Sequence, residues 1–165
     1  MDLRTELYRA TGVDLTAIDS INALTAQTVV SEIGTNVKAF STEAQFVSFL
    51  NLAPRNKISG GKVIGKEKRK KGQRAGLALQ QAATSLLQSD SYLGAQYRRL
   101  RTKLGAPPAK KAMANKLARI IYRMLKYGEA YVDKGKEFYE QRYRQIQLRI
   151  LERKAAQFNL KLVEN

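Results

Sequence analysis

The sequence contains no cysteine and no histidine among its 165 residues. The absence of cysteine excludes disulfide bonds, thiolate zinc sites and cysteine nucleophiles. The absence of histidine excludes an imidazole general base. Any catalysis by this chain therefore has to use serine, threonine, tyrosine, lysine, arginine or carboxylate side chains.

Long apolar segments are also lacking. The N-terminal run MDLRTELYRATG contains no apolar stretch of the length that a signal peptide needs. No run of about eighteen apolar residues, the minimum for a membrane-spanning helix, occurs anywhere in the chain. We therefore expect a cytoplasmic protein that does not enter a membrane.

Acidic residues are scarce. Only 14 Asp and Glu oppose 30 Lys and Arg, which gives a formal net charge of +16 and a pI of about 10.2. Such an excess indicates a polyanionic partner, either nucleic acid or an anionic membrane surface. The hydrophobic content of 44 % is too high for a disordered chain, so we expect one folded domain, with or without an extension.

The positive charge is concentrated in the middle of the chain. Residues 1–54 carry three basic and six acidic side chains, whereas residues 55–128 carry nineteen basic and two acidic ones. The excess lies in the glycine-punctuated run RNKISGGKVIGKEKRKKGQR and in residues 91–128, which contain no acid. A field of one sign repels itself without a partner, so we interpret both segments as nucleic-acid contacts. A membrane surface is disfavoured because the first segment lacks helical periodicity.

Apolar residues recur with helical spacing through most of the chain, which predicts an all-α fold. Asp14 is expected to cap a short turn, which Ser20-Ile21-Asn22 connects to a helix closed by Gly34. This is the outline of a helix-hairpin-helix, a motif that grips phosphate with backbone N–H groups. Ser41 is expected to cap the next helix, which ends before Pro54.

A loop and a helical bundle are expected after these helices. The glycines within residues 55–72 exclude a stable helix there, although residues 62–64 could pair as a brief strand. Helices are predicted at 73–88, 92–104, about 109–127 and 137–156, with Gly105-Ala106-Pro107-Pro108 as a break. The predicted inner faces are Ala75, Leu77, Leu79, Ala82, Ala83 and Leu86 in the first of these helices and Met113, Leu117, Ile120, Ile121 and Leu125 in the third. In the last helix, Tyr139, Tyr143, Ile146 and Ile150 recur at heptad-like offsets, which predicts a seam with another helix.

Ser59 is the strongest candidate nucleophile in the basic loop. The glycines that follow, Gly60-Gly61, leave room for a polymer backbone to approach its hydroxyl. Arg55, Lys57 and Lys62 would hold a phosphodiester and stabilise charge on its oxygens. A Ser-Gly-Gly-Lys sequence is also common in flexible turns, so the motif alone leaves a purely structural role open.

Other nucleophiles and metal ligands are less favoured. The eight tyrosines are alternatives to the serine, but most of the later ones fall at helical spacings that indicate packing. The acidic residues Asp90, Glu129 and Asp133 are too scattered to indicate a two-metal site.

Four segments of the chain, in this order, resemble the C-terminal domain of bacterial insertion-sequence transposases of the IS110 family, which is grouped with IS116 and IS902. They are GVDLTAIDSINALTAQTVVSEIG, FSTEAQFVSFLNLAPRNKISGGK, LGAQYRRLRTKLG and KLARIIYRMLKYGEAYVDKG. The resemblance covers nearly the whole chain from about Thr11, and several blocks in the correct order make it specific.

The resemblance implies a DNA recombinase that is guided by a structured RNA and works as a homo-oligomer. In this family a resolvase-like N-terminal domain supplies an acidic, metal-binding cluster, and a serine of the C-terminal domain forms a phosphoserine link to DNA. The matching serine here is Ser59. Met1 begins just upstream of the matched region, so we expect Mg²⁺ only together with the acidic domain. The chain by itself is expected to bind no cofactor and to be inactive.

The resemblance also defines the expected organisation. Residues 1–13 form a lead-in helix or linker, and residues 14–128 form the transposase C-terminal domain. Within that domain, residues 14–54 hold the hairpin helices, 55–74 the basic glycine-rich loop and 75–128 the helical core. Residues 129–165 form a C-terminal helix that is a candidate for oligomerisation.

The chain departs from the family pattern at several positions. The family usually has glycine at the hairpin turn and after the second helix, where this chain has Ser20, Asn22 and Asn51. Asn tolerates left-handed backbone geometry, so the turns are expected to persist, whereas phosphate gripping at the hairpin is called into question. Many relatives carry histidine at the position of Asn115, where any proton-transfer role is therefore lost.

We predict a catalytic transposase domain associated with the nucleoid, with double-stranded DNA and a structured guide RNA as partners. The alternative is a truncated, non-catalytic module that binds DNA or structured RNA. The predicted nucleic-acid-binding residues are Arg55, Lys57, Gly60, Gly61, Lys62, Lys66, Lys68, Arg69, Lys70, Lys71, Arg74, Arg98, Arg99, Arg101, Lys116 and Arg119.

Overall fold

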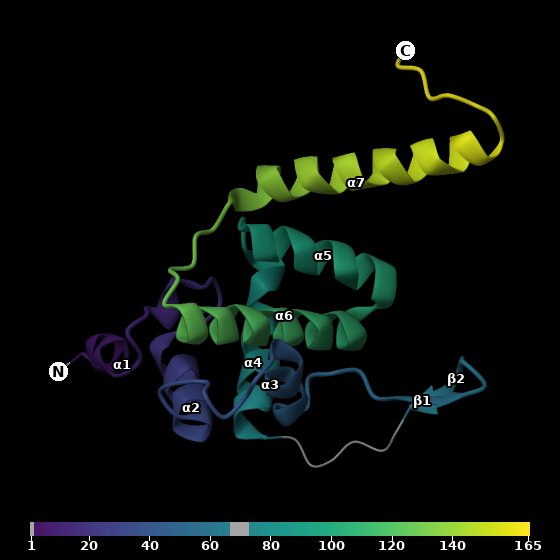
Figure 1. The fold of residues 1–165 in the computed structure, drawn as a ribbon. Coiled ribbons are helices and arrows are strands. Elements are labelled where there is room, and N and C mark those ends of the chain that lie inside the picture. The colour runs from purple at the N-terminus through teal and green to yellow at the C-terminus, as the bar shows by residue number, and fades with distance from the viewer. Residues whose placement is uncertain (1, 67–72) are drawn as a thin grey trace.

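Helices dominate the computed structural model, which describes residues 2–66 and 73–165 (Figure 1). In chain order the elements are α1 (Leu3–Thr11), the 3₁₀ turn η1 (Leu15–Ala17), α2 (Ala23–Ile33), α3 (Glu43–Phe49), β1 (Asn56–Ser59), β2 (Lys62–Lys66), α4 (Arg74–Ser85), the 3₁₀ turn η2 (Leu86–Gln88), α5 (Tyr92–Leu104), α6 (Ala106–Tyr127) and α7 (Gly135–Gln157). The predicted all-α class is confirmed, with one two-stranded sheet added to it. No helix in the described ranges has the length and apolar character needed to cross a membrane.

The core of the fold is organised around α6, which packs against α3, α4 and α5. Met113, Leu117 and Ile121 of α6 are fully buried, as the helical spacing predicted. The predicted partners Ile120 and Leu125 are partly buried at the edge of the same cluster. The inner face of α6 therefore carries the packing that holds the other helices in place.

The inner face of α4 differs from the prediction at one residue. Ala75, Leu79, Ala82, Ala83 and Leu86 are buried as predicted, but Leu77 is 54 % exposed. The buried residues follow the i, i+4, i+7, i+8, i+11 pattern of one helix face, and residue 77 falls on the opposite face. On the buried side, Gly76 lets α4 approach α3 closely, because a Cβ there would lie 2.2 Å from the carbonyl oxygen of Leu50.

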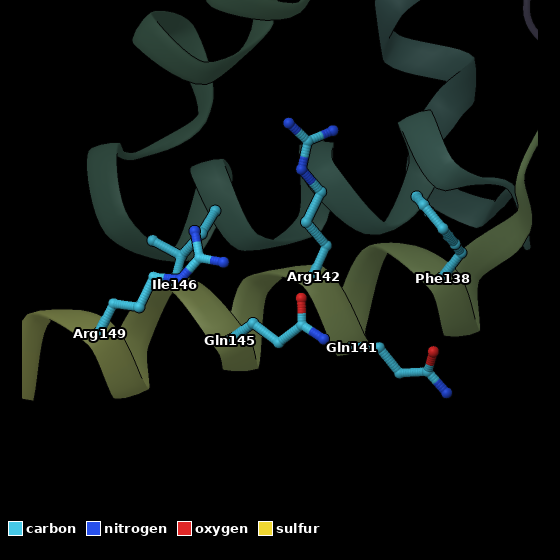
Figure 2. A pocket seen from close by; sticks show the side chains of 6 residues that line it. All are labelled: Phe138, Gln141, Arg142, Gln145, Ile146 and Arg149. Carbon is cyan, nitrogen blue, oxygen red and sulfur yellow. The ribbon is translucent and has the colours of Figure 1, made fainter.

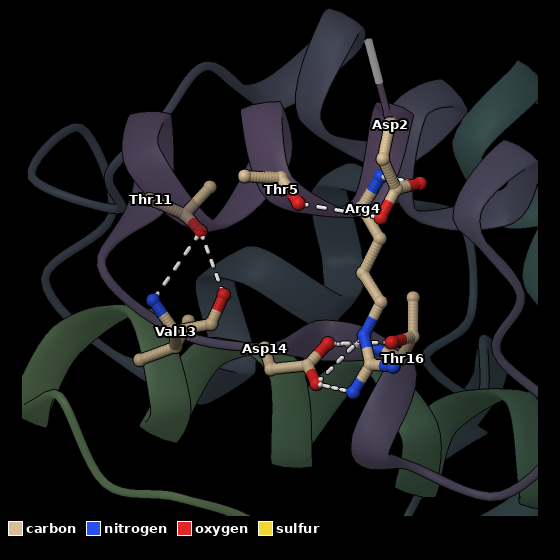
Figure 3. Close-up of polar contacts among 7 residues, drawn as sticks. All are labelled: Asp2, Arg4, Thr5, Thr11, Val13, Asp14 and Thr16. Carbon is tan, nitrogen blue, oxygen red and sulfur yellow. Dashed lines mark hydrogen bonds and ion pairs between the residues drawn. The ribbon is translucent and has the colours of Figure 1, made fainter.

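The N-terminal helix α1 is joined to η1 by a charged contact (Figure 3). The Asp14 carboxylate accepts a hydrogen bond from the backbone N of Thr16, at 3.0 Å, and caps η1 as predicted. It also accepts from Nε of Arg4 on α1, at 3.1 Å. The hydrogen bond from Arg4 is the main reason that the pKa of Asp14 is lowered, although partial burial opposes it.

The caps of the next two helices follow the sequence with one correction. Asn22 caps α2, and its side chain accepts from the backbone N of Thr25 at 2.8 Å. The predicted cap of α3, Ser41, is wrong by one residue, because Thr42 accepts from the backbone N of Gln45. Ser41 instead donates to the Gln45 side chain, which reaches back to the start of the helix.

The break between α5 and α6 lies at Gly105, which has a φ of +84°. The predicted start of α6 near Ala109 is therefore late, because the helix begins at Ala106. Pro107 and Pro108 fall in its first turn, where the missing N–H has no intrahelical acceptor to lose. The start of α6 thus follows directly on the basic end of α5.

The C-terminal helix α7 lies along α5 and extends past it (Figure 1). Six of its residues line a shallow hollow: Phe138, Gln141, Arg142, Gln145, Ile146 and Arg149 (Figure 2). None of its residues is fully buried. In the predicted seam, Tyr139 and Tyr143 pack on α5, whereas Ile146 and Ile150 are 44 % and 41 % exposed.

Candidate nucleic-acid interface

The segment predicted as a basic loop forms a β-hairpin over residues 56–66. β1 and β2 pair antiparallel, and Ser59 lies directly opposite Lys62 across a two-residue turn. Gly60 and Gly61 have φ angles of +56° and +76°, the pair of positive values that a type I′ hairpin turn needs. The prediction of a loop is therefore wrong here, and the brief strand expected at residues 62–64 is part of a longer pair.

The hairpin presents Ser59 together with two lysines. Ser59 and Lys62 are directly paired and therefore share one face, and Lys57 lies two residues before Ser59 on β1, across an irregularity in the register between Lys57 and Ile58. The side chains of both strands are exposed, and the hairpin projects away from the helices (Figure 1). A polyanion can therefore reach the Ser59 hydroxyl without displacing any part of the core.

The surroundings of Ser59 do not fit a divalent cation. β1 and β2 contain no Asp or Glu. Within residues 2–66 and 73–165, no group of three or more carboxylates could hold a metal ion. The predicted Mg²⁺ would need carboxylate ligands of another domain or chain.

A basic groove of about 560 Å³ lies at the base of the hairpin. Arg55 and Lys66, at the two ends of the hairpin, line it together with Lys110 and Lys111 from the first turns of α6. Among the described residues its lining contains no carboxylate, and the nearby start of α6 adds the partial positive charge of a helix N-terminus. Lys110 and Lys111 are not among the residues predicted from the sequence, because only the folded chain brings them next to Arg55.

The base of the hairpin is fixed to the helices by side-chain hydrogen bonds. Asn115 of α6 donates to the carbonyl of Leu52 at 3.0 Å, and Arg55 donates to Oδ1 of Asn51 at 3.1 Å. Asn51 adopts the left-handed conformation, with a φ of +58°, as its tolerance of this region predicted. These hydrogen bonds attach the base of the hairpin, and with it the groove, to the helical core.

The cations predicted on α5 do not share one role. Arg98 donates through Nη1 to the carbonyls of Leu87 and Ser89, at 3.1 and 2.6 Å, and so helps to hold η2. The guanidinium of Arg99 lies 3.6 Å from the ring centroid of Tyr143 on α7. Arg101 is exposed in the last turn of α5, close in the chain to the start of α6.

Glu43 partly neutralises the cations of α6. Its carboxylate pairs with Arg119 at 3.1 Å and also accepts a hydrogen bond from Arg123. Burial alone would raise the pKa of Glu43, but the hydrogen bonds from Arg123 and Arg119 outweigh it and hold that pKa below its ordinary value. Arg119 therefore forms a structural ion pair in addition to its predicted role in binding. Lys116 lines a cavity together with Arg142 of α7.

The remaining predicted cations follow the hairpin in the chain. Arg74 is exposed at the first position of α4, where the Glu32 carboxylate accepts from the backbone N of Ala75 at 2.9 Å. Four further predicted residues, Lys68, Arg69, Lys70 and Lys71, lie outside the described residues.

The turn predicted to grip phosphate faces carboxylates. A cavity of about 610 Å³ beside the segment 18–22 is lined by Asp19, Asp90 and Asp133, with no cation among its lining residues. Asp19 accepts hydrogen bonds from Ser91, at 2.8 Å, and from Ser89. Ser20 takes the left-handed conformation at the turn, with a φ of +77°. This arrangement ties the turn to α5 and disfavours a phosphate there.

The tyrosines serve mainly to pack the helices. The buried Tyr122 donates its hydroxyl to the carbonyl of Phe40 at 3.0 Å, and the ring of Tyr139 contacts that of Tyr92. Burial, followed by the charge of Asp133, raises the pKa of Tyr131 to about 12. Tyr131 is partly buried whereas Ser59 is exposed, so access to a polymer favours Ser59 over Tyr131.

Comparison with known proteins gives one family. No curated protein matches the chain. The model of the family described as Transposase IS116/IS110/IS902 matches residues 14–98, slightly more than half of the chain. The matched region includes the hairpin with Ser59 and ends within α5. The chain therefore belongs to the Transposase IS116/IS110/IS902 family.

Proposed function

We propose that the chain is the serine-bearing domain of a DNA recombinase, in which Ser59 is the nucleophile. The Oγ of Ser59 attacks a phosphorus of DNA, the bond from phosphorus to one deoxyribose oxygen breaks, and a phosphoserine link forms. The serine loses its proton and the departing deoxyribose oxygen gains one. The link conserves the energy of the broken bond for joining to another strand.

One observation carries this proposal: Ser59 is paired with Lys62 on an exposed hairpin that also carries Lys57, above a groove lined by cations. The two lysines would neutralise the non-bridging oxygens of the phosphate under attack. At about 3.4 Å per residue, Ser59 stands roughly 10 Å from the groove, so one DNA segment could occupy both. The groove would hold the DNA backbone while the hairpin presents the nucleophile.

The proposed site is composite. A serine hydroxyl is a poor nucleophile until a base or a metal removes its proton, and the described residues around Ser59 supply neither. We expect the hairpin to dock against an acidic, Mg²⁺-binding domain of the same or another subunit. A structured RNA that selects the DNA, and a homo-oligomer that brings two DNA segments together, belong to the same proposal.

The second candidate function is a nucleic-acid-binding module without catalysis. The observation that favours it is the lack of a general base or carboxylate cluster near Ser59 among the described residues. The two functions differ in one respect, because only the first requires a covalent bond between Ser59 and DNA.

The deciding experiment is to trap the covalent adduct. It uses this chain together with the acidic domain that the proposal requires, radiolabelled DNA and Mg²⁺, followed by denaturing electrophoresis. Ser59→Ala should abolish the adduct and leave DNA binding within a few-fold of wild type. Ser48→Ala, at an exposed position of α3, is the matched control and should form the adduct normally.

Two outcomes would contradict the catalytic proposal. An adduct that survives in Ser59→Ala would place the nucleophile elsewhere, with the tyrosines as the next candidates. DNA binding by the wild-type protein without any adduct, under conditions where the acidic domain binds Mg²⁺, would favour the non-catalytic module.

A further inference from the structure

A second cationic cavity lies between α5, the second half of α6, the connection at residues 128–134 and α7. Its volume is about 380 Å³, within the range of small-molecule sites. Lys116, Arg123, Lys134 and Arg142 line it, and Glu129 is the only carboxylate lining it in the part of the chain that the structure describes. The cavity therefore carries a net positive charge and is separate from the groove beneath the hairpin.

The cations of this cavity are only partly compensated. Arg123 is paired with Glu43, and Arg142 approaches the Tyr92 hydroxyl at 3.5 Å. Figure 2 shows Arg142 extending from α7 toward the neighbouring helices. Lys116 forms no ion pair with any carboxylate in the described ranges. Burial is the main reason that the pKa of Lys116 is lowered, and the charges of Arg123 and Arg142 lower it further.

The other wall of the cavity is apolar and has free backbone groups. Tyr131 is partly buried, whereas Val132 is 71 % exposed although it lines the cavity. Within the part of the chain that the structure describes, residues 129–132 neither donate nor accept a backbone–backbone hydrogen bond. A nucleobase is bound by an apolar surface on which its ring stacks and by hydrogen-bond partners for its edge. The apolar side chains of this wall and the unused backbone N–H and C=O groups beside them supply both.

We propose that this cavity binds one unpaired nucleotide of a nucleic acid. Its phosphate lies against Lys116, Arg123 and Arg142, and its base lies against Tyr131 and Val132. An unpaired nucleotide is required because the bases of an intact duplex are stacked and paired, so none of them is free to lie against this wall. The inference rests on the proposed nucleic-acid function and extends it, since it assigns single-stranded and double-stranded segments to different places on the protein.

The test places the fluorescent base 2-aminopurine in a short single strand, prepared once as DNA and once as RNA. The fluorescence of this base changes when it leaves its stacked neighbours and contacts protein. The whole chain is titrated with each strand, and with the same strand annealed into a perfect duplex. We expect a fluorescence change for the single strands and none for the duplexes.

Variants connect the signal to the cavity. Lys116→Met removes one charge and should weaken single-strand binding by about tenfold, the effect of one charge-assisted contact. Val132→Glu places a carboxylate on the exposed wall and should abolish the fluorescence change. Lys154→Met, an equal loss of charge on exposed α7 far along the helix from Arg142, is the control and should leave the change intact.

Each outcome decides the proposal. A signal from DNA, from RNA or from both supports it, and a signal from one of them alone identifies the source of the nucleotide. No signal from either single strand would overturn it. Equal weakening by Lys116→Met and Lys154→Met, with unchanged fluorescence, would overturn it, because binding would then be general electrostatic attraction. Inorganic phosphate that shifts the amide resonances of residues 129–134 as strongly as the strands do would also overturn it, because no base would be recognised. If the wild-type protein did not bind duplex DNA at all, the proposed function itself would be refuted.

Discussion

The side-chain amide of Asn115 donates a hydrogen bond to the carbonyl of Leu52, 3.0 Å away, and so joins α6 to the base of the hairpin. The Oδ1 of Asn115 accepts from Nε of Arg119 at 2.9 Å, and Arg119 pairs with Glu43 at 3.1 Å. One side chain thus links the segment that leads into the hairpin with Ser59 to α3 through α6. Asn115 therefore has a structural role in this chain.

Replacing Asn115 should therefore destabilise the fold. Leu52 is buried, so Asn115→Ala leaves its carbonyl without that partner. An unsatisfied buried carbonyl costs about 1–3 kcal/mol, and we expect a loss of that size in the free energy of unfolding. Urea denaturation measures it, with Gln141→Ala on exposed α7 as the control. A loss equal to that of the control would show that the hydrogen bond contributes nothing to stability.

Binding to nucleic acid should depend steeply on salt. If the basic segments neutralise about six to ten phosphates, the logarithm of the binding constant falls with the logarithm of salt by about 0.9 per contact on duplex DNA. Lys110→Met, in the groove, should reduce this slope by about one contact. Lys154→Met should leave it unchanged. A slope near zero on both DNA and structured RNA would remove the nucleic-acid assignment.

Acid should weaken the fold through Glu43. Because the pKa of Glu43 is lowered in the folded protein, its stabilising effect is fully present above the ordinary value of 4.5 and is lost as the pH falls through the folded pKa. Glu43→Gln should lower stability at neutral pH and make the decline below about pH 4.5 shallower. Asp14, whose pKa is also lowered, accounts for part of the decline that remains.

Urea denaturation at a series of pH values measures this effect. Glu140→Gln, at an exposed position of α7, serves as the matched control and should keep the wild-type profile. A Glu43→Gln profile parallel to that of the wild type would show that the pair with Arg119 and Arg123 does not stabilise the fold.

The helices could be predicted because their signals are local. The bounds of α5 agree with the prediction at both ends, since Ser91 caps its start and Gly105 closes it. The hairpin was missed because its strands are short and exposed, and so carry no burial pattern. The groove could not be predicted, because Lys110 and Arg55 line it together only once α6 has packed against the segment that ends in Leu52.

Self-association through α7 should depend on its aliphatic residues. The ring of Tyr139 contacts Tyr92, and Tyr143 lies beneath Arg99, so this part of the seam is already used within the chain. Ile146 and Ile150 are exposed and open to a partner helix. Light scattering should show a lower mass for Ile146→Asp than for the wild type. A monomer mass for both proteins would refute self-association through this seam.

The geometry of the hairpin turn should control whether Ser59 can react. Gly60 and Gly61 both have positive φ angles, and a Cβ at either position would meet no atom within 4 Å, so only the backbone conformation restricts substitution. Asn-Gly is a favoured pair for this type of turn, and Gly60→Asn should keep the hairpin and the covalent adduct. Gly61→Val should disrupt the pairing of Ser59 with Lys62, because a β-branched residue is strongly disfavoured at positive φ.

Since the hairpin is exposed, the melting temperature should stay near that of the wild type for both variants. Duplex binding through the groove should also persist within a few-fold, so adduct formation is the measurement that separates them. Normal adduct formation by Gly61→Val would show that the turn does not position the serine.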